Sequence, residues 1–213
     1  LLMHGLGFRR FAVMAHNRGA CVAYRMALDW PEDVARLVLL DIVTTWDFWR
    51  TLQTTAQHRG ENWAFLAQPA PIPESLIGAD PTAWLESCLR RATASHSLDP
   101  FDARALAAYR AMLSQSDHVH ATCEDFRAGA GCDLSDDRAD RSGGRRIPCQ
   151  TLLVWGKNGL LAGLADTVAL WRPWCRSVSG VMLDCGHYLP EEHPQGLLDA
   201  VLPFLSNAES ADE

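Results

Sequence analysis

Short, continuous apolar runs alternate with segments of helical periodicity near both ends of the chain. Unbroken hydrophobicity over a few residues is typical of parallel strands that are covered on both faces. Four runs show this pattern, the last more weakly: residues 11–15, 37–41, 151–155 and 180–184. Residues 18–30 have helical spacing that Pro31 ends, and residues 194–205 resemble a closing helix. Strands that alternate with helices predict an α/β fold with a mostly parallel sheet.

The pattern changes between residues 44 and 146, where helical periodicity replaces the strand signals. Residues 103–113 form an amphipathic helix by their spacing, and the polar stretch 133–146 resembles a return linker. A helical segment inserted between two strands of one sheet is typical of a lid. The sequence therefore predicts a core from residues 1–43 and 147–213, interrupted by a helical cap over residues 44–146.

The first residues conflict with this scheme. The chain starts inside an apolar run, and residues 1–5 resemble a strand that is followed almost at once by the strand at 11–15. A parallel crossover needs about a dozen residues or more. We therefore expect that the core is truncated near the N-terminus and that a helix-strand-helix unit is missing between Gly7 and Phe11.

Charge and cysteine usage narrow the class of partner. With 213 residues, of which 48% are hydrophobic, the chain can bury a real core, and its formal net charge is −7. A phosphate-binding surface needs a basic excess, so nucleic acid and anionic membranes are disfavoured. No apolar run is long enough for a membrane span. Seven cysteines without a C-x-x-C pair suit a reducing compartment. We expect a cytoplasmic protein with a small-molecule substrate, and a homodimer stays an open alternative.

One segment has the pattern of a nucleophile elbow. Residues 15–20 read Ala-His-Asn-Arg-Gly-Ala, follow a predicted strand and open a predicted helix. Small flanking residues permit the sharp turn that presents a central side chain, here Asn17, at the carboxyl edge of the sheet. The peptide N–H of Arg18 then points at a developing oxyanion, and the loop around Leu6 suits the second donor.

Two further residues complete a candidate triad. His187 follows the last predicted strand within a Gly-His pair, where such a fold places its general base; a satisfied structural histidine is the alternative. Asp41 ends the second strand and is a candidate for orienting that imidazole, although strand-end aspartates also cap loops.

These residues carry a resemblance to a known family. The chain resembles the fluoroacetate (haloacetate) dehalogenase group of α/β-hydrolases, close kin of epoxide hydrolases, from Phe11 to about Leu205. The likeness includes two cap phrases, residues 63–71 and 123–129. The family's elbow reads His-Asp-Arg-Gly-Ala-Arg, and this one reads His-Asn-Arg-Gly-Ala-Cys.

The resemblance implies a reaction and a site. In the family, the elbow carboxylate displaces halide from carbon to form an ester, which a His-activated water then hydrolyses. The resemblance places Asp41 as the acid that partners His187, and Arg18 as a clamp for the substrate carboxylate. Asn62 and Trp63 align with residues that bind the halide. No metal or organic cofactor is implied, and water is the co-substrate.

The place of the acid separates the dehalogenase-like arrangement from a second one. Many epoxide hydrolases carry the acid after a strand that ends in Trp-Gly. Here that stretch, residues 155–159, holds no carboxylate. The resemblance therefore favours the dehalogenase-like arrangement with Asp41.

The departures from the family pattern are as informative as the matches. Asn17 is a neutral amide and therefore a far poorer nucleophile than a carboxylate. Cys21 stands where the family has a second clamp arginine. A halide-binding His and Tyr align with Asn62 and Gly131, and a pocket Trp aligns with Ala92.

Three functions remain open from the sequence. The first is a carbon–halide hydrolase that is impaired because its nucleophile position holds Asn17. The second is a diverged homologue that binds small acids without catalysis. The third is an ester or lactone hydrolase in which His187 activates water directly, and an epoxide hydrolase is a related alternative. For Trp63 a packing role competes with halide binding, and the pair His118 and His120 is read as surface chemistry rather than as a metal site.

Overall fold

The computed structural model describes residues 1–52, 61–163 and 166–206, and it divides the chain into two compact units. The first, which we call the sheet unit, comprises Leu1–Thr44 and Asp140–Glu213. The second, the helical unit, comprises Thr45–Ala139. The helical unit is inserted between two strands of the sheet unit, and each unit is described by itself.

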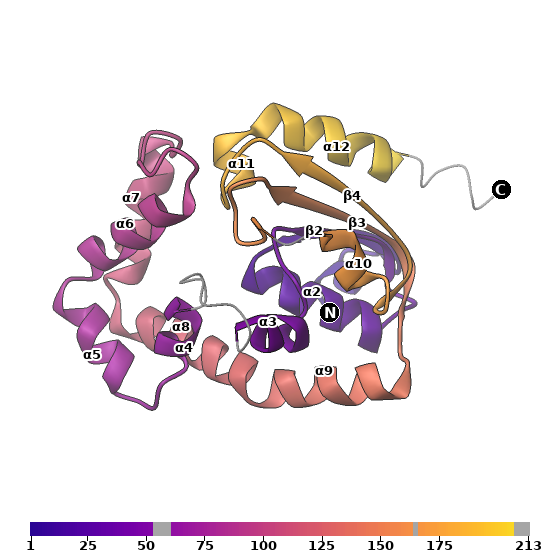
Figure 1. Cartoon of the computed structure of the whole chain (residues 1–213), viewed down its shortest axis with the longest axis horizontal. Coiled ribbons are helices and arrows are strands. Elements are labelled where there is room, and N and C mark those ends of the chain that lie inside the picture. Colours follow the sequence, from indigo (N-terminus) through magenta and orange to yellow (C-terminus); the bar gives the residue numbers. More distant parts are fainter. Residues whose placement is uncertain (53–60, 164–165, 207–213) are drawn as a thin grey trace. The chain divides into compact units, whose positions relative to one another are not determined.

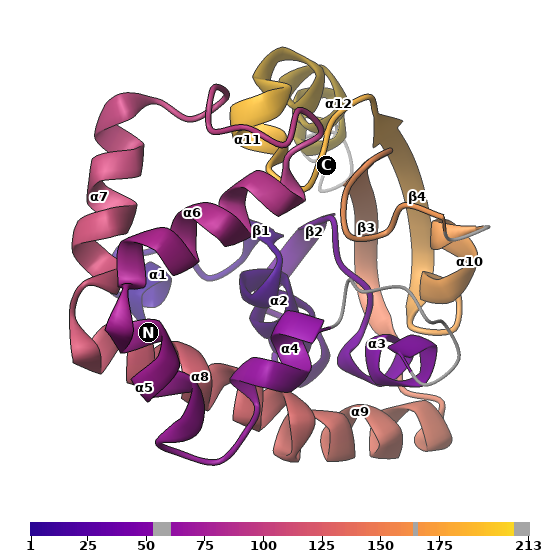
Figure 2. The same cartoon turned by 60° about the vertical axis from the view of Figure 1, so that its left-hand side comes forward.

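The sheet unit contains one parallel sheet of four strands in the order β1-β2-β3-β4. The strands, seen in sequence in Figure 2, are β1 (Phe11–His16), β2 (Val34–Leu40), β3 (Ile147–Gly156) and β4 (Cys175–Leu183). All four predicted strands are present, with bounds that differ by a few residues. β2 is buried along almost its whole length, as its unbroken apolar run predicts.

Helices cover both faces of this sheet (Figure 1). α2 (Arg18–Asp29) packs on one face, where α10 (Thr167–Trp171) is its neighbour. On the opposite face, Leu197 and Val201 of α12 (Pro194–Ser206) belong to a buried cluster with side chains of β2 and β3. The short α11 (Leu189–Glu192) precedes α12. Layers of this kind are those predicted for an α/β-hydrolase core.

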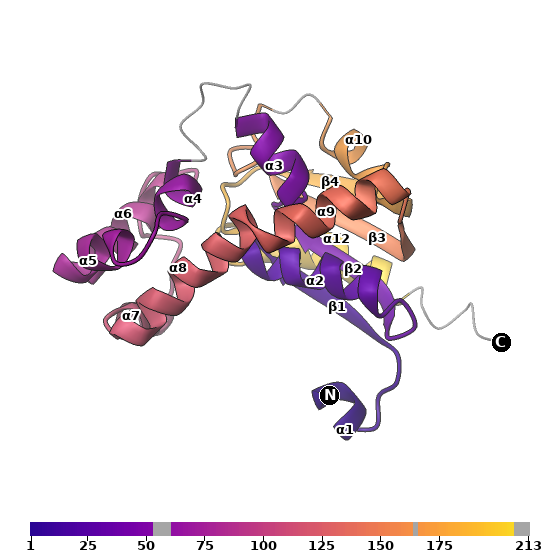
Figure 3. The same ribbon diagram turned by 90° about the horizontal axis from the view of Figure 1, so that it is seen from below.

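The first residues form a helix, so the strand expected over residues 1–5 is wrong. In α1 (Leu2–Gly5) the N–H of Gly5 donates to the Leu1 carbonyl, 2.9 Å away. Figure 3 shows α1 beyond the amino end of β1, away from the sheet. A short apolar run takes helical or extended form according to its available partners, and here its backbone bonds are local.

The polar stretch 133–146, expected to be a linker, is mostly helix. α9 (Cys132–Gly143) runs through it, and the boundary between the two units falls within this helix. Asp137 is 1% exposed and accepts a hydrogen bond from the Trp46 N–H at 3.0 Å. Asp140 lies 2.6 Å from the Arg25 guanidinium. The acidic residues that gave the stretch its loop-like composition therefore anchor a helix.

The helical unit has a small core of its own. Its helices before α9 are α3 (Thr45–Leu52), α4 (Glu61–Leu66), α5 (Ile72–Ala79), α6 (Pro81–Ala92), α7 (Ala103–Leu113) and α8 (Ser116–Ala130). Leu66, Ile77, Leu113, Val119 and Cys123 form its buried cluster. Among the described residues, no helix combines the length and the apolarity that crossing a bilayer requires.

Candidate active site

Asn17 occupies the sharp turn between β1 and α2. Its backbone has φ 51° and ψ −127°, a left-handed conformation that Asn tolerates better than most residues. Its carbonyl accepts hydrogen bonds from the Ala20 and Cys21 N–H groups, so Asn17 also begins α2. This is the geometry of a nucleophile elbow, and it presents the residue 17 side chain at the carboxyl edge of the sheet.

His187 links Asn17 to Asp41 through two short hydrogen bonds. Its Nε2 lies 2.6 Å from the Asn17 Nδ2, and its Nδ1 lies 2.6 Å from the Asp41 Oδ2. A carboxylate only accepts, so the proton of a neutral imidazole sits on Nδ1 and Nε2 accepts from the Asn17 amide. The structure thus brings together the three predicted catalytic residues in the order nucleophile position, base and acid.

The carboxylate of Asp41 is fixed from a second direction. Asp41 is 1% exposed, and its Oδ2 also accepts the Leu160 N–H at 2.6 Å. A Cβ added to Gly159 would lie 2.4 Å from the same oxygen, so only glycine fits at this position. Sequence reasoning missed Gly159 and Leu160 as parts of the site. The signal was the glycine in the loop after β3.

The loop that carries His187 is held by Glu192. The Glu192 carboxylate accepts the Gly186 N–H at 2.9 Å and the Tyr188 N–H at 3.0 Å, on either side of the histidine. Gly186 also packs so closely against Gly156 that a Cβ there would lie 1.9 Å from the Gly186 carbonyl oxygen. Glu192 is therefore a positioning residue, and nothing in the sequence pattern marks it as one.

Leu6, predicted as the second oxyanion donor, does not reach the site. Its N–H donates to the carbonyls of Leu2 and Met3 at 3.0 and 3.1 Å. His4 lies 3.1 Å from Asp33, which precedes β2 and so marks the amino edge of the sheet. The elbow is at the carboxyl edge. The prediction for Leu6 is wrong because it rested on a strand where the chain forms a helix.

Arg18 and Cys21 lie in the first turns of α2. As the first residue of the helix, Arg18 presents its peptide N–H at the helix N-terminus, where partial positive charge stabilises an anion. Cys21 is 5% exposed and belongs to the core under the elbow. The side chain that replaces the family's second clamp arginine is therefore a packing group.

His16 is a further histidine at the site that the sequence analysis did not single out. Its ring centroid lies 4.4 Å from that of His187. Burial, followed by the proximity of His187, lowers the pKa of His16 from 6.5 to about 4. His16 is therefore neutral in the folded protein at ordinary pH, and it places no positive charge beside the base.

This lowered pKa predicts a pH-dependent stability. Between pH 6.5 and 4 the unfolded chain binds a proton at His16 that the folded chain does not, so stability is full above this window and falls as the pH drops through it. Replacing His16 with Phe should remove about 2–3 kcal/mol of this loss. Denaturant unfolding at pH 7.5 and 4.5 measures the difference. His96→Asn, which replaces an exposed histidine, is the control and should lose as much stability between pH 7.5 and 4.5 as the native protein does. If His16→Phe also lost as much stability as the native protein, the assignment to His16 would be contradicted.

In the helical unit, Trp63 is a packing residue. It is 5% exposed, its ring centroid lies 3.7 Å from that of Phe48, and it meets Phe126 edge-on at 5.3 Å. This contact set explains why the aromatic phrase of α4 is needed for the fold of the unit. Halide binding by Trp63 remains a prediction.

Trp63→Ala is expected to destabilise the protein by about 3–5 kcal/mol, because it leaves a cavity between two aromatic rings. The control is Trp30→Phe, since Trp30 is 60% exposed and should change stability by less than about 0.5 kcal/mol. Thermal unfolding of both variants decides the matter. A melting temperature for Trp63→Ala equal to that of Trp30→Phe would show that the indole does not support the unit.

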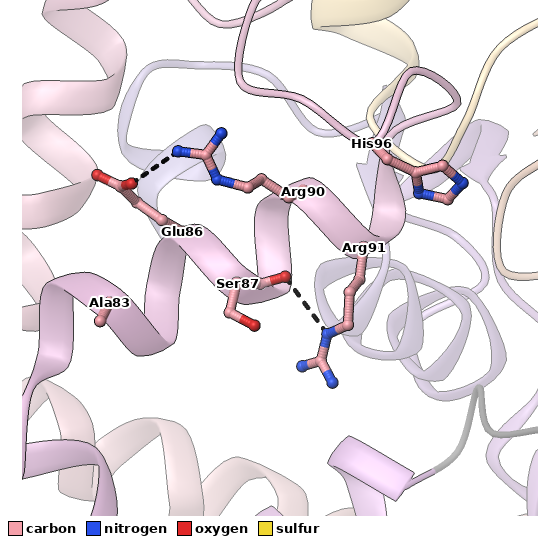
Figure 4. A pocket seen from close by; sticks show the side chains of 6 residues that line it. All are labelled: Ala83, Glu86, Ser87, Arg90, Arg91 and His96. Atoms are coloured by element: carbon pink, nitrogen blue, oxygen red, sulfur yellow. Dashed lines mark hydrogen bonds and ion pairs between the residues drawn. The ribbon is translucent and has the colours of Figure 1, made fainter.

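Asn62 is engaged by an arginine that the sequence analysis did not consider. Its Oδ1 accepts from the Arg91 guanidinium at 3.1 Å, and Arg91 also folds back onto the Ser87 carbonyl (Figure 4). Arg91 lines an open pocket of about 510 Å³ along α6. The lining residues are Ala83, Glu86, Ser87, Arg90, Arg91 and His96. This pocket holds basic and hydrogen-bonding groups but no base and nucleophile in contact.

One group in the helical unit has the spacing of metal ligands. Glu74, His120 and Glu124 offer ligand atoms within 4.8 Å of one another. The Arg127 guanidinium, however, donates to Glu74 at 2.7 Å and to Glu124 at 2.6 Å, and it lowers the pKa of Glu74 to about 2. Both carboxylates are already engaged by the same guanidinium, so we interpret the cluster as an ion-pair network between α5 and α8.

Comparison with known proteins agrees with this geometry. The sequence profile of the alpha/beta hydrolase fold family matches residues 2–194. The chain is 35% identical to a fluoroacetate dehalogenase from Burkholderia sp over 209 residues, which cover 98% of this chain and 68% of the relative. It is 26% identical to a soluble epoxide hydrolase from Corynebacterium sp. (strain C12), covering 96% of this chain and 70% of the relative.

Solved structures give the same result. A protein from Nostoc sp PCC 7120 that is assigned to the alpha/beta hydrolases superimposes with a TM-score of 0.89 at 42% identity, covering 96% of this chain and 69% of that one. A protein from Pseudomonas aeruginosa assigned to the epoxide hydrolases has a TM-score of 0.90 at 38% identity, covering 99% and 70%. The predicted fold and family resemblance are confirmed.

Proposed function

The chain belongs to the alpha/beta hydrolase family, and from this we propose that its site is built to hydrolyse small 2-halo carboxylic acids but is impaired at the nucleophile. One observation carries the proposal. His187 is hydrogen-bonded between Asp41 and residue 17 of a nucleophile elbow, so an ester formed on a carboxylate at that position would be attacked by water that His187 activates.

The reaction has two halves that place different demands on residue 17. In the first, a carboxylate oxygen attacks the halogen-bearing carbon, the carbon–halogen bond breaks and an ester forms. In the second, water adds to the acyl carbon of that ester, and hydroxy acid leaves. Asn17 fails the first half, because an amide oxygen is a poor nucleophile and its alkylation gives an imidate. His187 and Asp41 retain the groups needed for the second.

Groups next to the elbow support the proposed substrate class. Arg18 begins α2 and offers a guanidinium for one carboxylate, and the helix N-terminus adds positive potential. Cys21, buried in the core, supplies no second cation. We infer weaker binding of the substrate carboxylate than a clamp of two arginines would give.

The test is halide release from fluoroacetate and chloroacetate by freshly purified protein whose mass shows Asn at position 17. We expect release no faster than that of a His187→Gln control, because the alkylation step lacks its nucleophile. Rapid release of fluoride or chloride by the unaltered chain would contradict the proposed impairment.

Binding of small acids without turnover is the second candidate. It is favoured by an anion-stabilising helix N-terminus beside a residue that cannot form the ester. Chloroacetate that protects the chain against thermal unfolding, without any halide release from the Asn17→Asp variant, would support it. Direct ester hydrolysis is less favoured, because no feature of the described site selects an ester substrate.

A further inference from the structure

The amide of Asn17 stands where the family chemistry places an acyl carbon that awaits hydrolysis. An ester intermediate at position 17 and the Asn17 side chain differ only in the group attached to the acyl carbon, oxygen in one and NH₂ in the other. The base that hydrolyses the ester is already in contact with the amide, because the His187 Nε2 lies 2.6 Å from the Asn17 Nδ2.

We propose that the protein hydrolyses its own Asn17 side chain to Asp, with His187 as general base and Asp41 as its orienting partner. The inference uses the same dyad as the proposed function but does not depend on any halogenated substrate. It makes Asn17 a site of self-modification and gives the chain a route to the carboxylate that its encoded sequence lacks.

The step balances without an added reagent other than water. Water gives a proton to the His187 Nε2 while its oxygen bonds to the Asn17 Cγ. The resulting tetrahedral intermediate breaks its Cγ–Nδ2 bond, and the imidazolium returns the proton to the leaving nitrogen. Ammonia departs and takes the acid proton as ammonium, so the amide and water become a carboxylate and ammonium.

Three features of the sheet unit favour this step over hydrolysis of an ordinary asparagine. The amide N–H faces a bare imidazole nitrogen, so the base and the later proton donor are one atom, next to the leaving group. Asp41 is buried, bonded to the His187 Nδ1 at 2.6 Å, and stabilises the imidazolium. The Asn17 Oδ1 is buried and accepts no hydrogen bond from the described residues, and Asn17 directly precedes α2, a helix of twelve residues whose N-terminal partial charge favours negative charge developing on that oxygen.

The chain contains an internal control. Asn158 is followed by Gly159, a pair in which backbone attack on the side-chain amide converts asparagine through a cyclic imide. That route yields isoaspartate together with aspartate and needs no histidine. The proposed route yields aspartate alone at position 17, with an oxygen taken directly from solvent.

The experiment follows the mass of the full-length protein and of its peptides during incubation in ¹⁸O-labelled water at neutral pH. We expect the peptide with residue 17 to gain the mass of an amide-to-acid change that carries one labelled oxygen, and to contain only aspartate. His187→Gln should slow this conversion at least about 100-fold. The same variant should leave conversion at Asn158 unchanged.

Several outcomes would overturn the proposal: a residue 17 that stays asparagine, isoaspartate at position 17, or equal conversion with and without His187. If His187→Gln does not fold, Asp41→Asn serves in its place. The isoaspartate content of the native protein also decides between the routes without any variant. Conversion is read with no halogenated substrate present, so its failure is distinct from a failure of the Asn17→Asp protein to release halide.

Discussion

Asn17→Asp is expected to raise chloride release from chloroacetate by about 10⁴-fold or more over fresh native protein, the scale on which hydrolytic enzymes depend on their nucleophile. The reason is local. The variant supplies an anionic oxygen at an elbow whose backbone is already in place, opposite a histidine that is already bonded to its acid partner. The gain should appear in kcat. The KM should stay high, because Cys21 offers no second guanidinium that could bind a substrate carboxylate.

The measurement is halide release across a range of chloroacetate concentrations, with Asn17→Gln as the matched control. Gln keeps the amide and should stay at the native rate. A folded Asn17→Asp protein that is as silent as Asn17→Gln would show that the changed pocket, and not residue 17, removed the activity. The chain would then be better described as a binder of small acids.

The second large effect concerns Asp41. In the Asn17→Asp background, Asp41→Asn is expected to lower kcat by about 10⁴-fold, as in other triads whose acid becomes an amide. An asparagine at position 41 would donate to the His187 Nδ1 rather than accept from it. The imidazole then carries its proton on Nε2 and cannot take one from water.

The half-reaction at which the double variant stops is as informative as the loss of kcat. Alkylation of the carboxylate introduced at position 17 needs no base, whereas hydrolysis of the ester does. The double variant should therefore release one halide per site and accumulate a covalent ester on the protein. Intact mass after mixing with chloroacetate detects that ester. Asp33→Asn, at the amino edge of the sheet, is the matched control and should turn over normally. A double variant with the full rate, or with lost turnover and no ester, would contradict the role of Asp41.

Much of the fold followed from hydrophobic pattern alone. The runs that became β2 and β3 are buried on both faces, and such runs are the clearest signal of parallel strands. The predictions for two segments were wrong for the same reason. Residues 1–5 and 133–146 were interpreted by local composition, but their backbone and side-chain partners settled the outcome: Leu1 for Gly5, and Arg25 for Asp140.

The site residues that follow predicted strands could be predicted from the sequence. Asn17, Asp41 and His187 each follow a strand, and carboxyl ends of parallel strands meet at one edge of a sheet. Residues that support the site only through tertiary contacts have no comparable signal in the sequence. His16 contacts His187, and Glu192 fixes the loop around it, only because the chain folds.

The contact between Gly159 and Asp41 restricts where the acid of the triad can stand. The resemblance to epoxide hydrolases offers a second place for the acid, in the loop after β3, but in this chain that loop packs against Asp41, which directly follows β2. A side chain at residue 159 would collide with the Asp41 carboxylate, and losing Asp41 first would leave His187 without its partner. Neither order of single substitutions passes through a working triad. An acid at residue 159 is therefore incompatible with the acid at residue 41 in this packing, so moving the acid from one position to the other requires both residues to change together.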